Sequence, residues 1–271
     1  MTFLLDRVAD EFADRLATVR RRFDVAADIG TPGDAVSAAL SRLDPVGTIV
    51  RAGFLADATQ RSVAADEETL PFRDASLDLV VSGLALQFVN DLPGVLVQIR
   101  RALKPDGLFL AALLGGETLT ELRQSFAAAE SEIEGGISPR VVPFADLRDL
   151  GALLQRTGFA LPVTDVDRIT VRYATPFDLM RDLRRMGATN VLAARRRVPL
   201  RRATLLRMAE IYAERFADAD RRLRATFEIV WLSAWAPHPD QPKPLRPGSA
   251  KTRLADALGT REIGAGEKPT A

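Results

Sequence analysis

The chain contains no cysteine and a single histidine, His238, and these shortages exclude several kinds of chemistry. Without cysteine there is no disulfide, thiol nucleophile, iron–sulfur ligation or cysteine zinc site. One histidine also excludes sites that need two, such as a 2-His-1-carboxylate iron triad or an HExxH zinc motif. We therefore expect no metal site, and any catalysis must proceed without these groups.

Long apolar runs and an excess of charge are also missing. No stretch approaches the roughly 18 apolar residues that cross a bilayer, and 37 basic residues face 36 acidic ones. The N-terminal segment MTFLLDRVADEFADRL carries carboxylates from Asp6 onward and lacks the basic start and cleavage pattern of a targeting segment. These features predict a soluble, cytoplasmic protein that is not a general polyanion binder.

What is present is an alternation of helical and strand patterns. The 271 residues, 47% of them hydrophobic, are enough for one large α/β domain. Apolar residues at three- and four-residue spacing predict an N-terminal helix. Strands are predicted at 25–29, 47–52, 62–65, 77–82 and 108–114, with helices at 34–43 and 92–103. This alternation predicts βαβ crossovers and a doubly wound α/β sheet.

The second half of the chain contains two longer strand-like runs, 163–173 and 226–236. If they pair as an antiparallel edge, the residues between them form an insertion over the carboxyl ends of the strands, where open α/β sheets bind ligands. We predict four parts. They are an N-terminal helix (1–24), a core (25–173 and 226–236), a helical insertion (174–225) and a Pro- and Gly-rich, loose tail (237–271).

The predicted insertion is rich in arginine. Between Arg181 and Arg224 there are 13 arginines and 5 carboxylates, a local excess of +8. Such clusters suit an acidic protein, a phosphorylated carrier or peripheral contact with anionic lipid headgroups. An ordinary solvated surface in an arginine-rich chain is the alternative. The scarcity of interleaved aromatic residues argues against nucleic acid.

Two segments suggest a ligand site. The turn ADIGTPGD (27–34) joins a predicted strand to a helix, where a glycine-containing loop lets a ligand approach backbone amides. It is neither a GxGxxG motif nor a P-loop, and alone it is equally consistent with a plain connection. VAADEETLPFRDASLDLVVS (63–82) adds an acidic cluster after the third strand, whose carboxylates can accept a hydrogen bond from an adenine amino group.

DIGTPGD followed by ADEETLPFRDASLDLVVSGLALQFVNDLPGVLVQIRRALKPDGLFLAALLGG resembles the class I S-adenosylmethionine-dependent methyltransferases. The segments GGETLTELRQSFAAAESEIEGGISPRVVPF, FDLMRDLRRMGATN and SAWAPHPDQPKPLRPGSA extend the resemblance over nearly the whole chain. There the chain is similar to the family of mitochondrial complex I assembly factors with a methyltransferase fold and their alphaproteobacterial relatives. The resemblance implies a seven-stranded Rossmann-like sheet with an antiparallel last strand, S-adenosylmethionine as cofactor and a complex I subunit as partner.

The resemblance also implies seven cofactor-binding residues. They are Asp28, Gly30 and Gly33 in the first turn, Asp66 and Glu67 near the adenine, and Ser82 and Leu84 at the end of the fourth strand. No catalytic residue is implied, since Gln87 and Phe88 stand where many relatives have a His-Trp pair. Methyl transfer chiefly needs alignment and exclusion of water, so this absence does not argue against an enzyme.

Three residues depart from the family pattern. Pro32 removes an amide donor, and Asp34 places a carboxylate near the carboxylate of the ligand. Gly53 stands where an acidic residue usually binds both ribose hydroxyls, and Asp57 comes a turn too late to replace it. Losing a charge-assisted hydrogen bond weakens binding by about tenfold or more, which argues against binding of the cofactor.

Three functional hypotheses follow. The first is an S-adenosylmethionine-dependent methyltransferase acting on a protein or small molecule. The second, implied by the resemblance, is an assembly factor that hydroxylates an arginine of a complex I subunit. The third is a non-catalytic assembly scaffold with a degenerate cofactor loop, which the three departures favour.

Overall fold

The computed structural model describes residues 3–55, 61–241, 249 and 252–260. They belong to two compact units, residues 1–237 and residues 238–271. In the second unit the described residues form one short helix, α8 (Leu254–Leu258), which ends at Gly259. Most of the predicted loose tail, like Asp57, lies outside the described residues. No helix in the described ranges is long and apolar enough to cross a membrane.

A seven-stranded sheet forms the centre of the first unit, in the order β3-β2-β1-β4-β5-β7-β6. Its strands are β1 (Phe23–Ile29), β2 (Val46–Gly53), β3 (Ser62–Ala64), β4 (Leu77–Gly83), β5 (Leu103–Leu114), β6 (Ala160–Tyr173) and β7 (Leu223–Trp235). β7 runs antiparallel to both neighbours, while the pairs from β3 to β5 are parallel. This confirms the predicted doubly wound α/β sheet with an antiparallel last strand.

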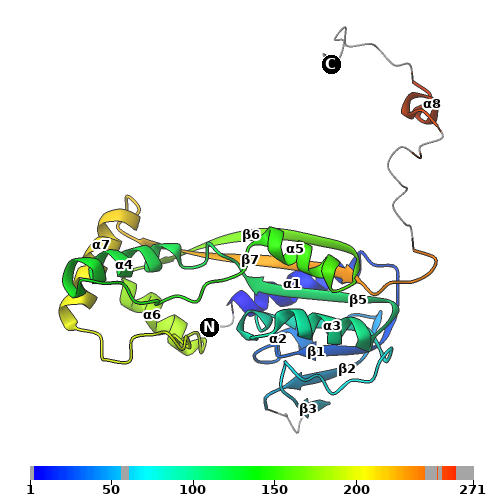
Figure 1. Cartoon of the computed structure of the whole chain (residues 1–271), viewed down its shortest axis with the longest axis horizontal. Helices are drawn as coiled ribbons and strands as arrows, with labels where there is room; N and C mark the ends of the chain where they lie inside the picture. Colours follow the sequence, from blue (N-terminus) through cyan, green and yellow to red (C-terminus); the bar gives the residue numbers. More distant parts are fainter. Residues whose placement is uncertain (1–2, 56–60, 242–248, 250–251, 261–271) are drawn as a thin grey trace. The chain divides into compact units, whose positions relative to one another are not determined.

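Helices cover both faces of the sheet (Figure 1). They are α1 (Phe3–Ala17), α2 (Ala35–Leu40), α3 (Leu92–Ala102), α4 (Thr120–Glu134), α5 (Leu147–Arg156), α6 (Pro176–Arg185) and α7 (Arg202–Phe216), with a short 3-10 turn at Leu86–Phe88. Alternate residues of β4 point to two apolar cores, one beneath α1 and α2 and the other beneath α3 and α5. All seven β4 residues are buried, as expected of a central parallel strand.

The predicted insertion lies past the carboxyl end of β5. Leu114, the last residue of β5, pairs with Ile229, and the β6–β7 pair continues to Tyr173 and Leu223. Figure 1 shows α4, α6 and α7 grouped at this end of the long β6–β7 pair. The four-part division of the chain stays a prediction, but its helical segment does lie at the ligand-binding end of the sheet.

Several predicted element ends are wrong. The N-terminal helix stops at Ala17, and β1 begins at Phe23, because residues 18–22 hold three consecutive arginines and no apolar face. β5 begins at Leu103, not at the predicted residue 108, and so includes the segment KPDG (104–107), with Asp106 at φ +59 and an irregular register against β4. β7 starts at Leu223, three residues before the predicted Thr226.

Candidate functional site

The turn after β1 is shaped by two glycines. Gly30 and Gly33 both have φ +69, a backbone conformation that residues with a side chain rarely adopt. The Gly30 amide donates to the carbonyl of Ala52 at 2.7 Å, which ties the start of the turn to the end of β2. The turn is therefore held open beside the carboxyl ends of β1 and β2.

Asp28 is the buried anchor of this turn. The hydroxyl of Thr31 donates to the carboxylate of Asp28 and accepts from the amide of Gly83 at 2.8 Å. Burial raises the pKa of Asp28 to about 6, and Thr31 and the Arg51 guanidinium oppose this rise. Because Thr31 bonds to both partners, it joins the end of β1 to the end of β4.

Arg51 is a site residue that sequence reasoning missed. It lies on β2 directly opposite Asp28, and its Nε is 3.7 Å from Oδ2 of that carboxylate. Its Nη2 donates to the carbonyl oxygens of Thr31, at 3.1 Å, and Gly33. One arginine thus balances the buried charge and holds the turn. The only signal in the sequence is a basic residue within an otherwise apolar strand.

Two cavities, each of about 360 Å³, flank the turn. The first, here called the loop cavity, is lined by Asp28, Gly30, Thr31, Pro32, Gly33, Arg51, Ala52, Gly53, Phe54, Leu55, Ser62 and Glu67. The second, the acidic cavity, is lined by Gly30, Pro32, Asp66, Glu67, Glu68, Leu84, Ala85, Phe88, Val89 and Asn90. Gly30, Pro32 and Glu67 line both, so the cavities form the two halves of one cleft.

Six of the seven residues predicted to bind a cofactor line this cleft. Asp28, Gly30, Gly33 and Glu67 border the loop cavity, and Asp66 and Leu84 border the acidic cavity. Ser82 is fully buried, and its hydroxyl donates to the carbonyl of Ile29 at 2.7 Å. Ser82 therefore supports the ends of β1 and β4 from within the core.

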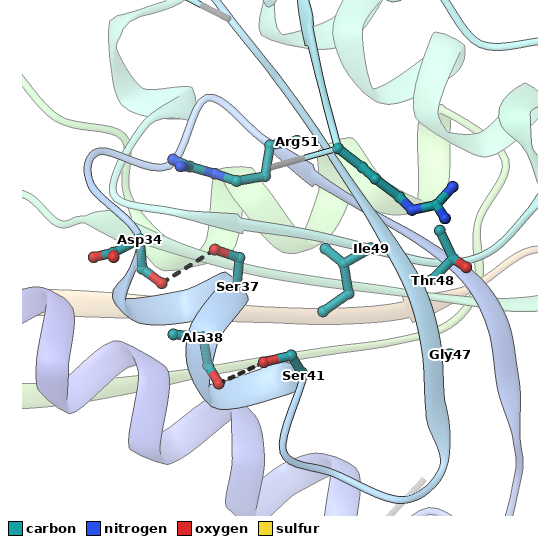
Figure 2. A pocket seen from close by; sticks show the side chains of 9 residues that line it. Asp34, Ser37, Ala38, Ser41, Gly47, Thr48, Ile49 and Arg51 are labelled. Carbon is teal, nitrogen blue, oxygen red and sulfur yellow. Dashed lines mark hydrogen bonds between the residues drawn. The ribbon is translucent and has the colours of Figure 1, made fainter. Parts of the chain in front are cut away.

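The three departures from the family pattern lie in different places. Pro32 and Gly53 line the cleft, while Asp34 lines a separate groove between α2 and β2, of about 520 Å³ (Figure 2). In that groove Ser37 and Ser41 donate their hydroxyl hydrogens to helix carbonyls at 3.1 and 2.9 Å. Asp34 thus lines this groove and neither half of the cleft on which its repulsion was predicted to act.

A smaller apolar chamber adjoins the acidic cavity. Its volume is about 90 Å³, and half-exposed Phe88 lines both spaces. Residues from the predicted insertion, including Leu183, Met186 and Asn190, close the other side. Among the described residues, Arg140 is the only charged one that lines this chamber, and it is paired with the fully buried Glu130. Within the described ranges, no group of three or more His, Asp or Glu side chains is placed to hold a metal ion.

Comparison with known proteins identifies relatives over most of the chain. A family model for a methyltransferase domain matches residues 28–111. The chain is 40% identical to the arginine-hydroxylase NDUFAF5 of Danio rerio, over 94% of this chain and 81% of that protein. It is 40% identical to the human protein of the same name, over 94% of this chain and 76% of that protein. It is also 36% identical to a malonyl-[acyl-carrier protein] O-methyltransferase of Xylella fastidiosa, over 79% and 74% of the two chains.

Solved structures share the fold at much lower identity. The YcgJ protein of a Bacillus species superposes with a TM-score of 0.56 at 13% identity, covering 86% of this chain and 99% of that one. The relatives also correct one expectation. A cytoplasmic location was predicted, but the zebrafish, mouse and human relatives are named as mitochondrial proteins. The absence of a recognisable N-terminal signal therefore does not establish a location.

Proposed function

The chain belongs to the family of the arginine-hydroxylase NDUFAF5, a family with a methyltransferase fold, and we propose that it is an S-adenosylmethionine-binding enzyme that modifies a partner protein. The observation that carries the proposal is the cleft at the carboxyl ends of β1, β2 and β4, built around Gly30 and Gly33. Open α/β sheets bind their ligands at this edge.

The charge of the cleft fits this ligand. S-adenosylmethionine carries a positive sulfonium and a positive amine against one carboxylate. Asp66, Glu67 and Glu68 line the acidic cavity, while Arg51 balances the charge of Asp28 in the loop cavity. Gly30 lies at the junction of the two cavities, and Phe54 and Leu55 offer exposed apolar surface beside the loop cavity for a planar base. When bound, the cofactor supplies an electrophilic methyl group.

The side chain to be modified is proposed to enter the apolar chamber next to Phe88. Phe88 stands between this chamber and the acidic cavity, so a group held there would face the cleft. Apolar walls from Leu183 and Met186 exclude water from such a group, which favours transfer reactions that need alignment more than acid–base catalysis.

The partner is proposed to dock on the arginine-rich insertion. Glu132 and Glu134 of α4 neutralise Arg207, Arg196 and Arg201 through ion pairs. Exposed arginines without an ion-pair partner in the described ranges include Arg184, Arg195, Arg197, Arg202, Arg221 and Arg222. A surface of this sign favours an acidic protein, and the resemblance of the sequence implies a complex I subunit.

The reaction has two candidates. Methyl transfer matches the methyltransferase domain and the O-methyltransferase relative, whereas the name of the NDUFAF5 relatives favours arginine hydroxylation. Mass spectrometry separates them, because methylation adds one carbon and two hydrogens to a peptide, and hydroxylation adds one oxygen.

The test incubates the full chain with S-adenosylmethionine, dissolved oxygen, a reductant and purified complex I subunits from the same organism, followed by peptide mass spectrometry. Oxygen and a reductant are supplied because hydroxylation inserts one oxygen atom and consumes two electrons, whereas methyl transfer needs only the methyl donor. A modified side chain that requires the chain supports an enzyme, and its mass identifies the reaction. Binding of S-adenosylmethionine is measured separately by calorimetry. A partner that binds in the absence of both cofactor binding and modification would favour the non-catalytic scaffold instead.

A further inference from the structure

Three consecutive acidic residues follow β3, and their carboxylates have different surroundings. Asp66 accepts a hydrogen bond from the amide of Glu68 at 2.8 Å. Glu68 accepts from both the backbone amide and the side-chain amide of Asn90. The carboxylate of Glu67 has neither a hydrogen bond nor an ion pair among the described residues. Of the three, only Glu67 has both carboxylate oxygens available to a ligand.

The Glu67 side chain lies over the ends of two strands. A Cβ atom added to Gly30 would lie 2.8 Å from Cγ and 3.1 Å from Oε1 of Glu67. A Cβ added to Gly53 would lie 3.9 Å from the same Oε1. One carboxylate oxygen therefore faces both the turn after β1 and the last residue of β2.

Position 53 is where the resembling methyltransferases carry the acid that binds the ribose. In this chain a short acidic side chain at position 53 would extend toward the place that Glu67 Oε1 already occupies. Glu67 lines both the loop cavity and the acidic cavity, and so stands at their junction. In an adenosyl ligand the ribose likewise lies between the base and the sulfur-bearing chain.

We infer that Glu67 replaces the missing acid of β2 and accepts hydrogen bonds from the ribose hydroxyls of the adenosyl ligand. The ribose acceptor then comes from the loop after β3, and Gly53 is the residue that leaves room for it. This inference rests on the proposed function, since it requires that the cleft take an adenosyl ligand.

Isothermal titration calorimetry on the full chain tests this assignment. S-adenosylhomocysteine and its 2′-deoxyribose counterpart are titrated into the wild type and Glu67→Gln. We expect Glu67→Gln to raise the Kd for S-adenosylhomocysteine by about 10- to 100-fold, as for the loss of a charge-assisted hydrogen bond. The effect should be smaller with the deoxy ligand, which offers Glu67 one hydroxyl instead of two. Asp74→Asn, which removes an exposed carboxylate outside the cleft, should leave both Kd values unchanged.

A second variant guards against a general electrostatic or folding effect. Gly53→Asp combined with Glu67→Gln returns a carboxylate to the position used by the resembling enzymes, and we expect it to recover much of the lost affinity. Circular dichroism and thermal unfolding check that every variant is folded.

The outcomes separate this inference from the proposed function. Wild-type binding that Glu67→Gln leaves unchanged or strengthens would overturn the role of Glu67 while leaving the cofactor site intact. Equal wild-type affinity for the ribose and deoxyribose ligands would do the same. A wild-type chain that binds neither ligand would overturn both.

Discussion

The Thr31 hydroxyl lies 2.8 Å from the backbone amide of Gly83, fifty-two positions further along the chain. The same hydroxyl donates its hydrogen to the buried carboxylate of Asp28. A single side chain therefore couples the glycine turn after β1 to the end of β4, and these two segments form one wall of the proposed cofactor cleft. The shape of the cleft depends on this coupling.

Replacing Thr31 by Val tests the coupling. Val keeps the shape of Thr but removes the hydroxyl, which leaves the Gly83 amide without its acceptor and Asp28 without a donor. We expect the free energy of unfolding to fall by about 1–3 kcal/mol in urea titrations. Thr31→Ser keeps the hydroxyl and should lose much less. A larger loss in Thr31→Ser than in Thr31→Val would show that the methyl group stabilises the turn more than the hydroxyl does.

The sheet is the part of the structure that the sequence predicts best. Apolar runs such as LDLVVS are long enough to identify buried parallel strands, and the β6 and β7 runs pair as expected. The ends of elements are less predictable because they depend on tertiary contacts. KPDG has turn composition, yet Asp106 donates its amide to Ala236 of the chain beyond β7, so the segment joins the sheet.

The sequence predicted where in the fold the candidate site lies, but not which of its side chains contact one another. The resemblance to methyltransferases implied Gly30 and Gly33, but the Arg51–Asp28 pair depends on the register between β1 and β2, which no sequence pattern specifies. Leu84 adopts φ +53 at the end of β4, a conformation that its apolar side chain does not signal. The direction of Glu67 depends on the turn that Asp66 stabilises.

Asp28 should give the chain a measurable pH dependence. Burial raises its pKa from 3.8 to about 6, so the folded chain binds this proton more tightly than the unfolded chain does. The ionised carboxylate of Asp28 therefore destabilises the folded chain, and the full destabilisation is present at pH values above its pKa in the folded chain. It disappears as the pH falls toward the pKa of Asp28 in the unfolded chain. When the pH is lowered from about 7 to about 4, we expect the free energy of unfolding of the wild type to rise by about 2 kcal/mol relative to that of Asp28→Asn.

Chemical denaturation of both chains across that pH range measures the effect. Because the other carboxylates titrate in both chains, their contributions cancel in the difference. A difference in unfolding free energy that does not change with pH would mean that the pKa of Asp28 is not raised. Arg51→Gln removes a cation that opposes the rise in the pKa of Asp28. In this variant the change of stability with pH should therefore occur at higher pH.

Gly30→Ala should block the cleft. The new Cβ would meet Glu67 Cγ at 2.8 Å and Ala85 Cβ at 3.0 Å, in a backbone conformation already unfavourable for alanine. Gly135→Ala is the matched control, since Gly135 has φ +70 but nothing within 4 Å of the added Cβ. We expect both variants to lose about 1 kcal/mol from backbone strain.

Binding distinguishes the two glycine variants. Calorimetry with S-adenosylhomocysteine should show normal affinity for Gly135→Ala and a loss of affinity of at least about tenfold for Gly30→Ala. The loss is expected because the added Cβ forces Glu67 away from the junction of the two cavities. If Gly30→Ala binds as the wild type does, the ligand does not approach the turn at this position.

The ion pair between Glu130 and Arg140 should be essential to the stability of the fold around the apolar chamber. Glu130 is fully buried, accepts from the amide of Ser138 at 2.8 Å, and pairs with Arg140. The Arg140 guanidinium also lies 5.3 Å from the ring centre of Phe126 and lines the chamber. Removing one charge leaves the other buried without its partner. This lowers the free energy of unfolding by more than the loss of an exposed ion pair does.

We expect Glu130→Gln to lower the free energy of unfolding by about 3–5 kcal/mol in denaturant titrations. Asp74→Asn breaks the pair with Arg101, in which both side chains are more than half exposed, and should cost less than about 1 kcal/mol. The double variant Glu130→Leu with Arg140→Met removes both charges and should be more stable than Glu130→Gln alone, because no unpaired charge stays buried. If the double variant is the less stable of the two, the residual interactions of Arg140 with its surroundings, including the Phe126 ring, contribute more than its unpaired charge costs.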